Sequence, residues 1–255
     1  MGNEVMTDDR WIRRFVQVPE ASARLVCLPH AGGSASYYLP VAKALAPKVE
    51  VLAIQYPGRQ DRRTEPCLES CQEMAEGVFA ALQPYLDKPL TLFGHSMGAS
   101  VSYELLRKLE SAGVWPTALF ASGRRAPGLN RDEGTHRLDD RGLIAEVQKL
   151  GGAGSHLLDD KDILGMVLPS IRGDYRAAET YTWTPGPKLK TPIHAFVGDA
   201  DPKVTEDEAR AWSEYTEGAS ELRVFPGDHF YIDTNADAVI DAIARHIEAS
   251  QAVRP

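Results

Sequence analysis

Residues 90–106 read Leu-Thr-Leu-Phe-Gly-His-Ser-Met-Gly-Ala-Ser-Val-Ser-Tyr-Glu-Leu-Leu, and this stretch decides the fold. The apolar residues near its start predict the end of a buried strand, and those after Gly98 have the spacing of an amphipathic helix. Between them, residues 94–98 fit the pattern Gly-x-Ser-x-Gly. A sharp turn from strand to helix needs small residues on both sides of the central one, and it raises that side chain above the sheet. The stretch therefore predicts a nucleophile elbow with Ser96 as the nucleophile.

Short apolar runs alternate with helical patterns along most of the remaining chain. The sequence predicts further strands at residues 15–18, 23–28, 49–56, 118–121, 193–197 and 222–225. Helices are expected between them, at 37–46, 67–82, 97–113, 205–215 and 236–247. This alternation indicates an α/β-hydrolase fold, with a mostly parallel sheet and helices on both faces.

The alternation stops between residues 126 and 190, a segment too long for a simple connection. It contains two helical patterns, at 143–150 and 163–175, and Pro169 should kink the second. We expect residues 126–190 to form a helical lid insertion whose underside lines an acyl chamber. Residues 1–125 and 191–255 would then form the hydrolase core. The alternative is an ordinary helical insertion that packs on the body.

A serine hydroxyl needs a histidine base, which in turn needs an orienting acid. In this fold the three follow in the order serine, acid, histidine, each on a loop after a strand. Asp201 and His229 follow the last two predicted strands in that order. Asp199 competes as the acid, although we expect it to make local hydrogen bonds. Of the seven histidines, only His229 occupies the required position.

Two backbone N–H groups should stabilise the negative charge that develops on the substrate oxygen. Met97, directly after the nucleophile, is expected to supply one. The other should come from the glycine-rich turn at residues 29–33, with Ala31 as first candidate and Gly32 as second. The alternative for this segment is a plain turn.

Charge and composition exclude several classes of function. The 255 residues carry a formal net charge of -8, which disfavours nucleic-acid binding. Cys27, Cys67 and Cys71 cannot all pair, and their spacing does not suit a metal site. Reduced thiols predict a cytoplasmic protein. We expect neither a membrane span nor a secretory signal, because no apolar run is long enough.

Five motifs together resemble the type II thioesterases, the stand-alone editing hydrolases of polyketide and nonribosomal peptide assembly lines. They are Pro29-His-Ala-Gly-Gly-Ser34, Tyr56-Pro-Gly-Arg59, Gly94-His-Ser-Met-Gly-Ala99, Gly198-Asp-Ala-Asp-Pro202 and Gly227-Asp-His-Phe230. The resemblance implies hydrolysis of aberrant acyl groups from the phosphopantetheine arm of acyl or peptidyl carrier proteins in antibiotic biosynthesis. It also implies that the enzyme needs no metal and no other cofactor. We expect a monomer.

Three arginines follow strands that should end near Ser96. Arg59, Arg124 and Arg125 would then form a local basic rim on a net acidic protein. The resemblance implies an acidic carrier protein with a phosphate on its arm, and arginine suits both. The alternative is that these arginines are solvated or paired with nearby carboxylates.

Other functions share part of this pattern. A general carboxylesterase or an acyl-CoA thioesterase would have the same triad. An acyl-chain transferase would not need the acid after a strand, so residues 198–201 favour a hydrolase. A non-catalytic, hydrolase-like binding protein usually lacks a triad member, whereas serine, acid and histidine are all present here.

Overall fold

A seven-stranded sheet forms the centre of the computed structural model, which describes residues 9–152 and 160–252. The strand order is β1-β3-β2-β4-β5-β6-β7. Strand β1 is antiparallel to β3, and every other neighbouring pair is parallel. The strands are β1 (Ile12–Arg13), β2 (Ala23–Leu28), β3 (Val49–Ile54), β4 (Leu90–His95), β5 (Leu119–Ser122), β6 (Ile193–Gly198) and β7 (Ser220–Phe225). The carboxyl ends of six strands therefore meet at one edge.

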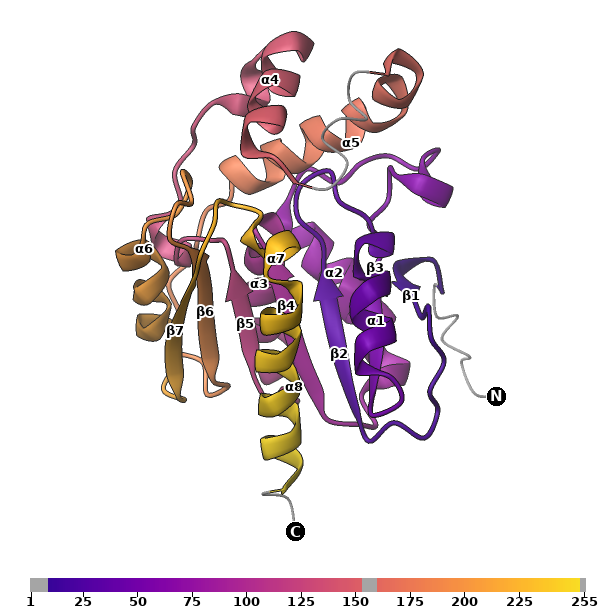
Figure 1. Ribbon diagram of the computed structural model, residues 1–255, viewed down its shortest axis with the longest axis vertical. Helices are drawn as coiled ribbons and strands as arrows, with labels where there is room; N and C mark the ends of the chain where they lie inside the picture. The colour runs from indigo at the N-terminus through magenta and orange to yellow at the C-terminus, as the bar shows by residue number, and fades with distance from the viewer. Residues whose placement is uncertain (1–8, 153–159, 253–255) are drawn as a thin grey trace.

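Helices cover both faces of the sheet, as Figure 1 shows. Helices α1 (Leu39–Leu45) and α8 (Ala236–Ala252) lie on one face, and α2 (Cys71–Leu82) and α3 (Met97–Ser111) lie on the other. All six residues of β2 are buried, because both of its faces are covered. The predicted α/β-hydrolase arrangement of sheet and helices is confirmed.

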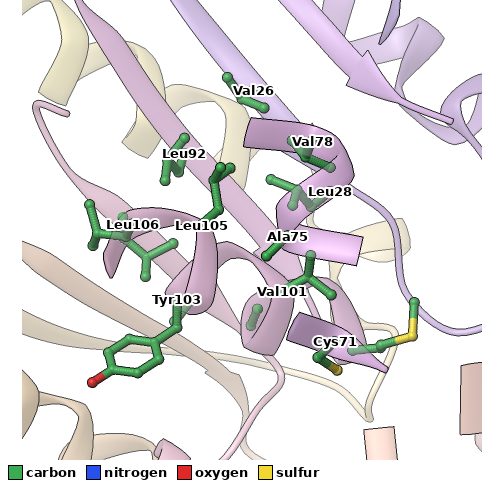
Figure 2. Packing of buried hydrophobic residues seen from close by; sticks show 14 of the residues in the cluster. Val26, Leu28, Cys71, Ala75, Val78, Leu92, Val101, Tyr103, Leu105 and Leu106 are labelled. Carbon is green, nitrogen blue, oxygen red and sulfur yellow. The ribbon is translucent and has the colours of Figure 1, made fainter. Parts of the chain in front are cut away.

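The core on the α2–α3 side fixes how helix α3 lies on the sheet (Figure 2). The α3 residues at helical spacing are all fully buried: Met97, Val101, Leu105 and Leu109. They share one cluster with residues of β2, β4 and α2. Burial of each large apolar side chain contributes about 1.5–3 kcal/mol, so this stripe holds α3 firmly on the sheet.

The remaining helices surround the carboxyl edge of the sheet. Helices α4 (Asp140–Leu150) and α5 (Lys161–Glu179) lie above it, and α6 (Glu206–Arg210) and α7 (Tyr231–Thr234) follow β6 and β7. Thr205 and Glu208 form a capping box at the start of α6. Short 3-10 turns are Asp9–Trp11, Ala35–Tyr38, Gln60–Arg62, Gln83–Tyr85, Pro127–Leu129, Thr135–Arg137 and Ala211–Tyr215.

Helix α5 has two parts with different packing. Its first part, up to Pro169, contributes only partly buried residues to a small apolar cluster with α4 around Leu143, and Ile171, just after Pro169, is the buried α5 member of that cluster. Its second part reaches the main core, where Ala177 and Ala178 are buried. The segment at 126–190 therefore combines a projecting portion with one that is built into the body.

Two sequence-based boundaries were wrong. The edge strand forms at Ile12–Arg13 instead of 15–18, because Ile12 pairs with Ile54 while Val16 packs against the core as part of a loop. Helix α2 begins at Cys71 instead of residue 67, because the Ser70 hydroxyl accepts the Glu73 N–H and caps the helix there. In the described part of the chain, no helix has both the length and the apolar character to cross a membrane.

Candidate active site

The elbow predicted at residues 94–98 joins β4 to α3. Ser96 has φ 53° and ψ -119°, a conformation that few residues other than glycine adopt. The flanking glycines are required by close approach. A Cβ on Gly94 would lie 2.3 Å from the Gly98 carbonyl oxygen, and one on Gly98 would lie 2.1 Å from the Leu28 carbonyl oxygen. Both contacts are far shorter than real Cβ atoms show, so larger residues would force the strand and helix apart.

The three residues predicted to form a triad lie together at the carboxyl edge of the sheet. The Ser96 hydroxyl lies 3.0 Å from His229 Nε2, and His229 Nδ1 lies 2.9 Å from Asp201 Oδ2. The side chains of His229 and Asp201 are 5% and 0% exposed, so water does not compete for these bonds. The arrangement can move a proton from serine to imidazole while the carboxylate orients the ring.

Asp199, the competing acid, binds elsewhere. Its Oδ1 accepts the Gly227 N–H at 2.8 Å and so ties the loop after β6 to the loop after β7. Asp201 Oδ1 meanwhile accepts the Lys203 N–H at 2.8 Å, which fixes the carboxylate that faces His229.

The two expected oxyanion donors border the same site. Met97 is the first residue of α3, so its N–H has no acceptor within the helix. Ala31 lines the cavity beside Ser96, and its N–H has no acceptor among the described residues. The second candidate, the Gly32 N–H, is already bound to Asp174 Oδ2 at 2.7 Å. The turn therefore offers Ala31 and not Gly32.

A cavity of about 70 Å³ lies above Ser96 and His229. Its walls come from the loops that follow β2, β4, β5, β6 and β7, and its cover comes from α4 and α5. Pockets that bury a whole ligand usually measure about 300–1,000 Å³. This one is too small for a long acyl chain in the conformation described.

Comparison with known proteins settles the family. A family model for the thioesterase domain matches residues 23–250. The chain belongs to the thioesterase family. This thioesterase is 49% identical to thioesterase PikA5 of Streptomyces venezuelae, over 93% of this chain and 85% of that one. It is 44% identical to a probable cadicidin biosynthesis thioesterase of Streptomyces griseus, over 96% of this chain and 68% of that one.

A solved structure agrees with this assignment. The thioesterase resembles the type II thioesterase BorB from the borrelidin biosynthetic cluster, with a TM-score of 0.89 and 51% identity. The match covers 93% of this chain and 98% of BorB. The predicted resemblance to type II thioesterases, and with it a serine hydrolase, is confirmed.

A group of aromatic rings around His229 was not predicted from the sequence. The ring centroids of His95 and Phe230 lie 5.1 and 5.4 Å from that of His229, and His30 contacts both of these neighbours. Burial lowers the pKa of His30 to about 3 and that of His95 well below its usual range. Both are therefore uncharged at neutral pH. His156 lies outside the described residues.

The three arginines of the expected rim are largely enclosed. Arg59 is 5% exposed and paired with Asp174, and Arg125 is 4% exposed and paired with Glu133. Arg124 is partly buried. It and Arg125 line the cavity, whereas Arg59 is not part of its lining. The prediction of an exposed rim formed by all three arginines is therefore wrong. A position at the end of a strand places a residue near the site, but it does not reveal the buried partners of that residue.

Arg124 has unusual surroundings for a cation. Among the described residues its hydrogen-bond acceptors are neutral: Ser100 Oγ at 2.9 Å, Asn130 Oδ1 at 2.6 Å and the Ala178 carbonyl at 2.6 Å. Burial lowers the pKa of its guanidinium. Arg125 Nε has no hydrogen-bond acceptor within the described chain. Arg125 is already paired with Glu133, and its Nε lies 4.0 Å from Glu208 Oε1, so Arg124 is the cation of this wall that has no paired carboxylate among the described residues.

One group of potential metal ligands was found in the described part of the chain. Ligand atoms of Asp132, His136 and Glu179 lie within 4.8 Å of one another. Glu179 already accepts the N–H groups of Thr135 and His136 and contacts His136 Nδ1 at 2.6 Å. We therefore interpret the group as a hydrogen-bonded cluster that joins the end of α5 to the turn at residues 135–137.

Proposed function

We propose that this protein is an editing thioesterase that removes aberrant acyl groups from the phosphopantetheine arm of acyl or peptidyl carrier proteins in polyketide or nonribosomal peptide biosynthesis. The observation that carries the proposal is the chain of hydrogen bonds from Ser96 through His229 to Asp201 beneath a covered cavity. The relatives named above support the biosynthetic setting. We propose that the enzyme acts as a monomer in the cytoplasm, where its three free cysteines stay reduced.

The proposed reaction begins when Ser96 Oγ attacks the thioester carbonyl carbon and His229 Nε2 takes the hydroxyl proton. Asp201 holds the Nδ1–H and stabilises the imidazolium. The N–H groups of Met97 and Ala31 bind the resulting oxyanion. Collapse of the tetrahedral intermediate breaks the carbon–sulfur bond, and the pantetheine sulfur receives the proton from His229. An acyl-serine remains.

Water completes the cycle by the reverse use of the same groups. His229 takes a proton from water as its oxygen attacks the acyl carbon, and then returns that proton to Ser96 Oγ as the acid is released. Every step uses side chains and backbone N–H groups of this chain, so the proposed mechanism calls for no cofactor. The carrier protein supplies the phosphopantetheine.

We propose that the projecting part of the 126–190 insertion acts as a lid over a hydrolase core formed by 1–125 and 191–255. Leu150 of α4 and Tyr175, Ala178 and Glu179 of the second part of α5 line a cavity that is too small for a long acyl chain. The small apolar cluster around Leu143 joins α4 to residues of α5 on both sides of Pro169, so opening of the lid requires this cluster to repack. Pro169 interrupts the hydrogen bonding of α5 where the projecting part meets the anchored one.

We retain Arg124 and Arg125 as proposed contacts for the substrate's anionic groups. Two features of the cavity wall support this role. The Arg124 guanidinium has neutral hydrogen-bond acceptors, and the buried Arg125 Nε has no hydrogen-bond acceptor among the described residues. Arg59 does not fit this role, because Asp174 occupies both of its terminal nitrogens.

A substrate panel tests the function. The purified protein is assayed with acyl-carrier proteins of different chain length, with the matching acyl-CoA thioesters and with oxygen esters, beside Ser96→Ala. We expect the largest kcat/KM with acyl-carrier substrates and loss of activity in the variant. Preference for oxygen esters would indicate a carboxylesterase, and preference for acyl-CoA would indicate an acyl-CoA thioesterase. A folded protein that neither turns over nor labels with a fluorophosphonate would be a binding protein.

A further inference from the structure

A buried ion pair connects α5 to the loop that follows β3. Arg59 Nη1 lies 2.6 Å from Asp174 Oδ2, and Nη2 lies 2.8 Å from Oδ1, so the contact is bidentate. The side chains are 5% and 0% exposed. Burial opposes the charged form of Arg59, but the adjacent carboxylate outweighs it and raises the guanidinium pKa. The guanidinium is therefore held charged in the interior.

The same pair binds the turn that carries Ala31. Asp174 Oδ2 accepts the Gly32 N–H at 2.7 Å, and Arg59 Nη1 donates to the Gly33 carbonyl at 3.1 Å. Two consecutive residues of the turn are thus held by opposite charges. Side-chain packing adds to this, since a Cβ on Gly32 would lie 2.9 Å from Cγ1 of Ile171 on α5. The turn has little freedom while α5 stays in place.

We propose that Arg59 and Asp174 are positioning residues that set the oxyanion hole. The inference rests on the proposed function. The Gly32 N–H belongs to the peptide that begins at the Ala31 carbonyl, so fixing it orients Ala31, which lines the cavity and whose own N–H has no acceptor among the described residues. The carboxylate comes from α5 and the guanidinium from the loop after β3. Formation of the oxyanion hole therefore depends on α5 being seated on the body.

A structural role alone is the competing explanation. Buried ion pairs are weak evidence for stability, because desolvation offsets much of their attraction. Two features favour positioning. The bonds of the pair to Gly32 and Gly33 are shorter than the two 3.4 Å contacts of Arg59 with the Pro57 carbonyl, and the turn they hold carries Ala31, which lines the cavity. Displacement of a donor by about 1 Å, or its loss, typically lowers turnover by about a hundredfold.

The test uses Asp174→Asn and Arg59→Lys, with Glu50→Gln as the matched control. Glu50 is 2% exposed and pairs with Arg24 at 2.8 Å on the strands β2 and β3, in another buried ion pair that does not line the cavity. Functional active sites are counted by fluorophosphonate titration, and kcat is expressed per site. We expect kcat of both Asp174→Asn and Arg59→Lys to fall about tenfold to a hundredfold with KM within twofold of the parent. Glu50→Gln should keep kcat per site and lose only thermal stability.

Two acyl-pantetheine analogues separate positioning from binding. A trifluoromethyl ketone forms a serine adduct that carries an oxyanion, whereas a thioether without the carbonyl does not. The ketone's affinity should fall by the same factor as kcat, and that of the thioether should stay within twofold. An unchanged kcat per site in the variants, or equal loss for both analogues, would overturn the proposal.

A double variant covers the case in which a single change prevents folding. Arg59→Met with Asp174→Leu leaves no unpaired buried charge and removes both bonds from the pair to the turn. A kcat per site more than tenfold below the parent supports positioning, and one within twofold of the parent contradicts it. If the parent itself hydrolyses no thioester, the proposed function fails first, and the two failures are thereby distinguished.

Discussion

Replacing Gly98 by alanine tests the geometry of the elbow without touching a reacting group. The new Cβ would lie 2.1 Å from the Leu28 carbonyl oxygen and 2.7 Å from that of Pro29. Both are backbone atoms, so no side-chain rotation relieves the contact. Helix α3 and the end of β2 must separate by about 0.9 Å for the shorter contact to reach 3.0 Å, below which real Cβ atoms are essentially never found.

This separation moves the two expected oxyanion donors apart, because Met97 begins α3 and Ala31 follows β2. A displacement near 1 Å costs on the order of a hundredfold in turnover. Overpacking of this kind destabilises a protein by about 1–3 kcal/mol. For a chain of this size, that lowers the thermal midpoint by roughly 3–10 °C.

The assay compares kcat for an acyl-carrier substrate and the thermal midpoint with those of Gly165→Ala. A Cβ on Gly165 meets nothing within 4 Å, and alanine favours a helix by about 0.5–1 kcal/mol relative to glycine. That control should be as active as the parent and slightly more stable. A Gly98→Ala protein with parental kcat would refute the reasoning, since it would mean that the donors tolerate the separation.

Three further predictions concern other parts of the molecule. His30 has a pKa of about 3 when folded and about 6.5 when unfolded, so the unfolded state binds more protons between these values. The free energy of unfolding should therefore fall as the pH drops below 6.5, and this group contributes at most about 1.4 kcal/mol per pH unit to that fall. When the free energy is measured by denaturant unfolding, it should fall less steeply with decreasing pH in His30→Gln. Of the three cysteines, Cys67 alone is not fully buried, so a disulfide reagent should titrate one thiol in the native protein and three after denaturation; rapid reaction of all three would contradict the packing. Arg124→Gln should raise KM for an acyl-carrier substrate about tenfold and change that for a small acyl thioester by less than twofold; an equal rise for both would remove the arginine from anion recognition.

The order of strands and helices could be predicted from the sequence because it depends on local patterns. Strand β2 follows from the apolar run at residues 25–28, and the elbow follows from two glycines around Ser96. The order of Ser96, Asp201 and His229 could be predicted because parallel strands end at one edge. These features need no knowledge of which distant residues meet.

Side-chain partners far apart in the chain could not be predicted. Arg59 and Asp174 are 115 positions apart, and nothing near either one indicates the other. The enclosure of Arg59 depends on this pair, and Arg125 also donates to the Lys203 carbonyl, 78 positions away, which explains the error about an exposed rim. Strand β1 was misplaced for a related reason, since its two residues are defined by pairing with β3 and not by their own alternation.

At Ser96, where φ is 53°, the residue that is best for stability differs from the residue that catalysis requires. Glycine adopts this conformation without strain, whereas strained residues of this kind cost about 1–3 kcal/mol. A library screened only for heat resistance should therefore accumulate Ser96→Gly and lose the hydroxyl. A library screened for turnover should keep the serine and gain stability elsewhere. Thermostability engineering of this chain should hold position 96 fixed, because the most favourable local substitution there is also the one that removes the nucleophile.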